Sequence, residues 1–173
     1  GYHDYNINLT IKDCTFNAPE NTQYALMLQS TTGINGKVTV DGCTSSGYPR
    51  GITLQRPNTD CVVTNNTTRS TVREPDRCAI QLTDGKSFVV TGNKVDVNAG
   101  NAFWFHNAAS NANVTYTISN NDIKAPYIGY YGTSFDVNDK ITSSGNKFNS
   151  TDTTKCMKKD ATVAEATNLT ALH

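Results

Sequence analysis

The sequence has no net charge, no long apolar run and few residues of the types that carry recognisable chemistry. Its 15 Lys and Arg balance 15 Asp and Glu, and 173 residues include 3 His and a single Trp. A neutral chain has no global attraction for nucleic acid or for an anionic membrane. No stretch approaches the roughly 20 apolar residues of a membrane-spanning helix. We therefore expect neither a nucleic-acid partner nor membrane insertion.

Metal-binding spacings are also missing. The 5 cysteines include no C-x-x-C pair, and no His cluster accompanies them. Sulfur ligation of zinc normally shows such paired spacings. We expect no metal and no other cofactor.

Polar β-forming residues are abundant instead. Asn and Thr make up about a quarter of the chain, which is only 36% hydrophobic and 17% charged. Thr suits half-exposed strands, and Asn tolerates left-handed turns. The length predicts one domain over residues 1–173.

A short β-run followed by a turn recurs along the chain. Two apolar residues lie two positions apart, and Asn or Cys follows three positions after the second. The sixth copy, beginning at Asp139, replaces the first apolar residue and carries two extra turn residues. The five regular copies start at Leu9, Val38, Cys61, Phe88 and Tyr116.

A second motif alternates with the first. Its inward apolar residues are Leu26, Ile52, Ile80, Phe103 and Ile128, which recur about every 23 to 28 residues. Period-two alternation marks strands with one buried face. Two different motifs that alternate strictly favour a solenoid over a β-sandwich, which is the competing all-β architecture. The prediction is a right-handed parallel β-helix of about six coils over residues 7–150. A third short strand is expected in each coil, through residues such as Phe16, Val95, Ile123 and Phe148.

The two ends of the chain differ. A capping box at 162–165 precedes apolar residues at helical spacing, which predicts a short C-terminal helix within a cap over about 151–173. Such a helix would cover the open edges of the last coil. The N-terminus shows no comparable cap, so we expect the chain to belong to a longer protein.

Cys14 and Cys43 hold the turn position that Asn occupies in later coils. Equivalent positions of adjacent coils lie about 4.8 Å apart, within the Cα range of a disulfide. A Cys14–Cys43 bond and a stacked pair of buried free thiols are both consistent with this spacing.

The alternating motifs and the Asn series resemble the pectate-lyase-like superfamily of right-handed β-helices over residues 7–150. Pectate lyases place calcium-binding carboxylates on an outward sheet face, but the outward residues of the second motif here include none. Polygalacturonases carry Asn-Thr-Asp, a paired Asp and Gly-His-Gly; residues 58–60 match only the first element. The charged loop 73–77 could hold an acidic sugar or supply an acid and a base through Glu74 and Asp76; a solvated loop with mutually compensating charges is the favoured interpretation. We therefore assign no catalytic residue.

The predicted ligand site is an aromatic patch on the second motif; packing of Trp104 under a loop such as 108–113 is the structural alternative. An exposed Trp and Tyr can present ring faces to sugars, while amides offer hydrogen bonds. Tyr131 is expected to stack beside His106. The predicted glycan-binding residues are Trp104, His106, Tyr127, Tyr131, Gln55 and Gln81.

These observations predict a non-catalytic domain of an exported or cell-surface bacterial protein, secreted although this sequence shows no signal peptide. It would serve as a spacer or a weak glycan-binding module, and act as a monomer or as part of a larger chain. The alternative is a pectin- or alginate-type polysaccharide lyase or glycoside hydrolase, or a fragment of one. A trimeric phage-type spike is a third interpretation, which lacks the expected apolar stripe.

Overall fold

A computed structural model gives the fold of the chain. It describes residues 7–17, 24–29, 36–47, 50–55, 59–70, 78–98, 101–106, 113–125, 130–133, 139–149 and 157–159. Within these ranges the protein contains strands and turns and no helix. The predicted helix at the C-terminus lies outside the described residues. Inside the predicted cap, Met157–Lys159 forms strand β18.

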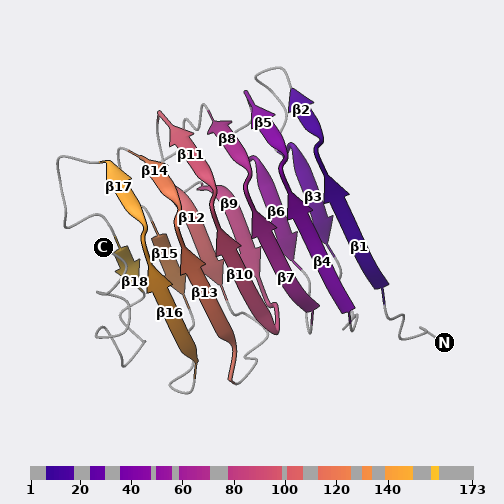
Figure 1. The fold of residues 1–173 in the computed structure, drawn as a ribbon, viewed down its shortest axis with the longest axis vertical. Helices are drawn as coiled ribbons and strands as arrows, with labels where there is room; N and C mark the ends of the chain where they lie inside the picture. The colour runs from indigo at the N-terminus through magenta and orange to yellow at the C-terminus, as the bar shows by residue number, and fades with distance from the viewer. Residues whose placement is uncertain are drawn as a thin grey trace.

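Three parallel sheets of six strands each make up the described fold (Figure 1). Sheet A contains β1 (Ile7–Lys12), β4 (Gly36–Asp41), β7 (Thr59–Thr64), β10 (Ser87–Thr91), β13 (Thr115–Ser119) and β16 (Lys140–Ser144). Sheet B contains β2 (Thr15–Asn17), β5 (Thr44–Ser46), β8 (Thr67–Ser70), β11 (Lys94–Val97), β14 (Asp122–Lys124) and β17 (Lys147–Asn149). Sheet C contains β3 (Leu26–Gln29), β6 (Ile52–Gln55), β9 (Cys78–Thr83), β12 (Asn101–His106), β15 (Tyr130–Thr133) and β18.

The chain visits the three sheets in the same order on each pass, and every strand pairs with the strand three elements later. This is a parallel β-solenoid, which confirms the predicted architecture. The third strand predicted after each Asn turn is also confirmed. The right-handed sense of the coils stays a prediction.

The core is built from in-register apolar rows. The first apolar residues of the sheet A motif pair in order, for example Val38 with Cys61 and Phe88 with Tyr116. Their side chains are buried together with those of the inward residues of sheet C. Burial raises the pKa of the Tyr116 phenol far above its usual value, and the charges of Asp139 and Asp84 act in the same direction. Because no coil can bury its own inward residues alone, stacking of neighbouring coils supplies the hydrophobic stabilisation.

The turn between sheets A and B uses one left-handed residue in each coil. Asp13, Gly42, Asn65, Gly92, Asn120 and Gly145 have φ between +53° and +68°. Asx and Gly tolerate this conformation, whereas most residues are strained in it. The two types alternate because each Asx side chain occupies the space above the next glycine. A Cβ on Gly92 would lie 2.6 Å from the Asn65 Oδ1.

One position after each left-handed residue lies a ladder of buried asparagines. It consists of Asn66, Asn93, Asn121 and Asn146, whose side-chain amides bond in series at 2.9 to 3.0 Å. Each Nδ2 also donates to the carbonyl of an inward sheet A residue one coil earlier. Each Oδ1 accepts the backbone N–H of the preceding ladder residue, which is Cys43 at the start of the series. The amides thus satisfy backbone groups that the turn removes from the sheets.

The sixth copy of the sheet A motif was predicted in the wrong register. Ile141 pairs with Tyr116, and Ser143 pairs with Ile118, so Ile141 is the first inward residue and Ser143 is the second. Asn146 then follows Ser143 by the usual three positions, and the turn has no extra residues. Asp139 lies before β16 and accepts a 2.9 Å hydrogen bond from the Val114 N–H. A polar residue in an inward row concealed the correct alignment.

Candidate functional site

The outward face of sheet C carries two in-register rows of side chains. Ile52, Ile80 and Phe103 point to the core, so strand alternation directs the intervening residues outward. The first outward row is Met27, Thr53, Gln81 and Trp104. The second outward row is Gln29, Gln55, Thr83 and His106. The backbone register continues from Trp104 to Tyr131 and Lys158, and from His106 to Thr133. We call this surface the sheet C face.

Trp104 and His106 form its aromatic centre. Their ring centroids are 5.3 Å apart with an interplanar angle of 30°, and both side chains are partly buried. The register places Tyr131 beside Trp104, not beside His106, whose partner is Thr133. The predicted stacking of Tyr131 on His106 is therefore wrong. Tyr127 lies outside the described residues.

The glutamines of this face form hydrogen bonds with neighbouring side chains. Gln29 Nε2 donates to Gln55 Oε1 at 3.2 Å, and Gln81 Nε2 donates to Thr83 Oγ1 at 3.4 Å. The second bond fixes the amide orientation of Gln81 and leaves its Oε1 in need of a donor.

Two polar atoms in the first row have no partner within the described protein. They are Thr53 Oγ1 and Gln81 Oε1, and their residues are register partners on β6 and β9. The two residues are 2% and 9% exposed, so both are buried. A buried polar atom without a hydrogen bond costs about 1 to 3 kcal/mol. Two adjacent buried polar atoms without hydrogen-bond partners, which we call the orphan pair, lie beside an aromatic pair. This combination is the strongest indication of a ligand on this face.

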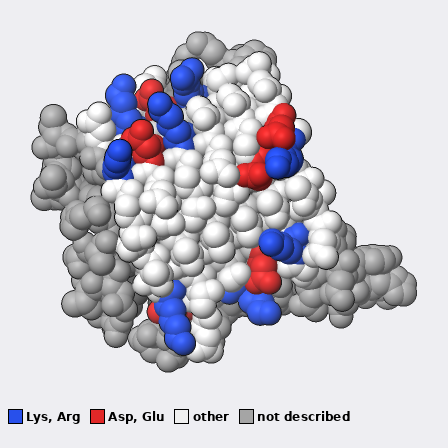
Figure 2. All heavy atoms as spheres, viewed as in Figure 1, with Lys and Arg blue, Asp and Glu red and all other residues white. Residues whose placement is uncertain are grey.

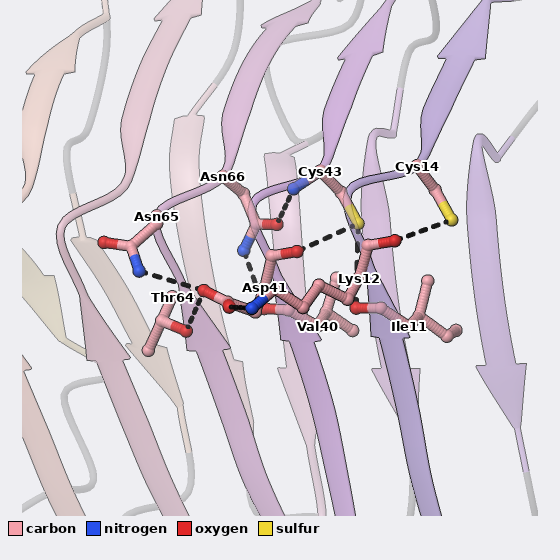
Figure 3. A network of polar contacts seen from close by, with 9 residues as sticks. All are labelled: Ile11, Lys12, Cys14, Val40, Asp41, Cys43, Thr64, Asn65 and Asn66. Carbon is pink, nitrogen blue, oxygen red and sulfur yellow. Dashed lines mark hydrogen bonds and ion pairs between the residues drawn. The ribbon is translucent and has the colours of Figure 1, made fainter.

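The thiols of Cys14 and Cys43 form a second polar feature, at the start of the turn ladder (Figure 3). Both cysteines are free. Cys14 Sγ donates to the Lys12 carbonyl at 3.3 Å, and Cys43 Sγ contacts the Asp41 carbonyl at 3.5 Å. Of the two predicted alternatives, the structure shows the stacked thiols. Burial raises the pKa of the Cys43 thiol.

Asp41 collects a small network on the outside of the same turns (Figure 3). Its Oδ1 accepts 2.9 Å hydrogen bonds from Asn65 Nδ2 and Thr64 Oγ1, and Lys12 Nζ lies 3.6 Å from its Oδ2. The bond from Asn65 contributes most to holding the pKa of Asp41 below its usual value, followed by the bond from Thr64. Hydrogen bonds to a carboxylate favour its charged form.

This network makes a pH prediction for Asp41→Asn. A folded-state pKa below the unfolded value gives stability that is present above about pH 4 and lost as the pH falls through the folded pKa. The wild type should therefore be more stable than the variant at pH 7, and the gap should close toward about pH 2. Urea unfolding at both pH values measures it. Asp122→Asn, on the outward side of sheet B, is the matched control, and an equal gap at both pH values would contradict the prediction.

The other predicted candidates do not converge on the sheet C face. Asp60 lies in β7 of sheet A, where its Oδ1 accepts a 2.6 Å hydrogen bond from Ser87 Oγ. Residues 58 and 73–77 lie outside the described ranges. Among described residues no three His, Cys, Asp or Glu side chains gather in a metal-binding group. The same residues include no helix long and apolar enough to cross a membrane.

Sequence reasoning missed Thr53 and Thr83. Thr is common in this chain and by itself gives no signal. The alignment of the second motif would have placed both beside Gln81, but their burial depends on neighbouring coils.

The fold and its outward rows define a parallel β-solenoid repeat protein. The chain matches, over residues 1–167, the family described as periplasmic copper-binding protein (NosD), and it belongs to that family. The parallel β-helix part of the predicted resemblance is thereby confirmed. No curated protein and no solved structure matches the chain.

Proposed function

We propose that this domain is a non-catalytic, rigid spacer of an exported bacterial protein, and that its sheet C face binds a neutral glycan weakly. The observation that carries the proposal is the orphan pair Thr53 and Gln81 beside Trp104. The periplasmic description of the family supports export.

The chemistry of the face suits a sugar. Aromatic rings such as that of Trp104 pack against the apolar face of a sugar ring, while hydroxyl groups supply donors for Gln81 Oε1 and Thr53 Oγ1. Both orphan atoms are buried in the free protein, so a ligand hydroxyl reaches them only with local rearrangement. That rearrangement lowers the net affinity, which is why we expect weak binding.

The charge pattern favours a neutral ligand. The sheet C face has no Lys, Arg, Asp or Glu from Met27 to Trp104 in its first row, and none from Gln29 to His106 in its second row. Figure 2 shows that the opposite side, over sheet A, is also uncharged across its centre. Its Lys, Arg, Asp and Glu side chains gather toward the margins of that face (Figure 2). Neither surface has the concentrated positive charge that would attract an acidic polysaccharide.

A glycan array with the wild type and Trp104→Ala tests this function. We expect wild-type binding to neutral glycans and a loss of about tenfold or more in the variant, because a buried aromatic contact contributes about 1.5 kcal/mol or more. Thr117→Ala, on the outward side of sheet A, should bind like the wild type. Equal signals from wild type and Trp104→Ala, or no signal from either, would refute glycan binding.

Thr53→Val gives a more specific result, in which stability and affinity change in opposite directions. Removal of the orphan hydroxyl should raise the free energy of unfolding by about 1 kcal/mol, because the buried oxygen no longer lacks a partner. The same change should weaken glycan affinity about fivefold, since the ligand loses one hydrogen bond. Chemical denaturation and titration with the best array glycan measure the two effects. A variant that loses both stability and affinity would show that Thr53 is structural only.

Copper binding is a second candidate function, favoured by the family description. The described residues do not offer the multi-ligand imidazole and carboxylate site that Cu(II) prefers, because no three potential ligands cluster. They do contain one pair of neighbouring thiols, Cys14 and Cys43, which suits soft Cu(I). These two residues would hold the ion.

A further inference from the structure

We infer that Cys14 and Cys43 form a two-thiolate site for a single Cu(I) ion, shared by the first two coils of the solenoid. This inference rests on the second proposed function and assigns its residues, its oxidation state and its stoichiometry.

The register brings the two thiols together. Lys12 pairs with Asp41 before the turn, and Thr15 pairs with Thr44 after it. The Thr44 N–H donates to the Cys14 carbonyl at 2.8 Å, so the two turns stack without offset. Figure 3 shows both side chains leaving their coils in the same direction. Cys43 Sγ also lies 3.7 Å from the Ile11 carbonyl, on the side of the first coil.

Stacked, parallel cysteines are better placed for a bridging ion than for a disulfide. Equivalent atoms of in-register strands are separated by the strand spacing of about 4.8 Å. A disulfide needs Cβ atoms about 3.5 to 4.5 Å apart, so it would require the two coils to shift. An ion between the two sulfur atoms requires only that the thiols leave their carbonyl partners, and S–H donors are weak.

The ligand set selects the metal. Thiolate is a soft ligand and favours Cu(I), while zinc in structural sites takes four ligands. Among the described residues no third His, Cys, Asp or Glu joins the pair in a group that could hold a metal. Cys14 is partly exposed and Cys43 is buried, so the ion has an approach from the Cys14 side. On binding, two Cu–S bonds form, both thiol protons pass to solvent and the copper stays Cu(I).

The pair also differs from the rest of the ladder. From Asn66 onward every position is an amide whose donors and acceptor are used within the ladder. At the first two positions the ladder is met by a backbone group, because the Cys43 N–H donates to Asn66 Oδ1. The thiols themselves contact backbone carbonyls and no ladder amide. Binding a metal there would therefore not disrupt the asparagine network.

The test titrates Cu(I) alone into the full chain, kept anaerobic, against bicinchoninate as a coloured competitor. We expect the wild type to withhold one Cu(I) per chain and to gain thiolate-to-copper charge-transfer absorbance in the ultraviolet. Cys14→Ser and Cys43→Ser should each lose at least tenfold in affinity and lose that absorbance. Cys61→Ser is the matched control, since it removes a buried thiol of sheet A, and it should retain the ion. Zn(II) at the same concentration should not be retained.

The outcomes separate this site from copper binding in general. Circular dichroism checks folding, and if Cys43→Ser does not fold, Cys14→Ser decides, because Cys14 is outside the fully buried core. Undiminished Cu(I) retention by Cys14→Ser would overturn the inference and leave the copper function standing elsewhere in the chain. Transfer of all Cu(I) from the wild type to the competitor would also overturn the inference. If a parallel Cu(II) titration then showed no binding, the proposed copper function would be refuted as well.

Discussion

Asn93→Ala should lower the free energy of unfolding by about 3 to 5 kcal/mol, because several buried polar groups lose their partners at once. Asn93 Nδ2 donates to the Val63 carbonyl at 2.9 Å and to Asn121 Oδ1 at 3.0 Å. Its Oδ1 accepts from the backbone and side-chain nitrogens of Asn66 at 3.1 and 3.0 Å. Alanine fulfils none of these roles, so the Val63 carbonyl, Asn66 and Asn121 Oδ1 each lose a partner.

Urea denaturation followed by circular dichroism measures the change, with Asn98→Ala as the control. Asn98 is exposed just after β11 and should cost less than about 0.5 kcal/mol. A loss below about 1 kcal/mol in Asn93→Ala would mean that the ladder does not stabilise the turns. Such a result would also remove the reason for treating Cys14 and Cys43 as a distinct beginning of the series.

The sequence predicted the repeating parts of this fold because each repeat has the same spacing of inward apolar residues and turn residue. Val38, Val40 and Cys43, for example, keep the spacing of Phe88, Val90 and Asn93, and the structure pairs the strands in that register. The left-handed turn residue was visible as an Asx or Gly before each ladder position. Such positions depend mainly on local backbone geometry and on identical neighbours, so one coil predicts the next.

The less regular features could not be obtained in the same way. In the sixth copy the second inward position is Ser143, so hydropathy alone aligned Ile141 to the wrong row. The error is a shift of two residues along β16, which keeps Ile141 on the inward face because side chains alternate with a period of two. On the sheet C face, alternation gave the direction of Gln81 and Trp104 correctly, but burial and missing partners depend on packing between coils. Tyr131 was placed beside His106 because Ile128 was aligned with Phe103, whereas the structure pairs Tyr130 with Phe103.

Phe88→Ala should cost about 3 to 5 kcal/mol, comparable to the loss of a ladder amide but through a cavity. Phe88 is 2% exposed; its ring stacks on Tyr116 with centroids 5.2 Å apart and meets the edge of Phe105 at 6.2 Å. Gly85 allows this packing, because a Cβ there would lie 2.5 Å from the Phe88 Cζ. Phe88→Leu fills most of the space and should recover more than half of the loss.

Hydrogen exchange distinguishes the cavity in Phe88→Ala from a uniform loss of stability. In a solenoid each coil contacts mainly its neighbours, so protection should fall first in β10, β12 and β13, which hold the aromatic cluster. Strands β1 and β4, which lie three and two coils away from β10 along sheet A, should keep more of their protection. An equal loss in all six strands of sheet A would mean that the domain unfolds as one cooperative unit. In that case a ligand on the sheet C face would stabilise the thiol pair as strongly as it stabilises the strands it touches, since linkage in a two-state domain acts on every residue alike.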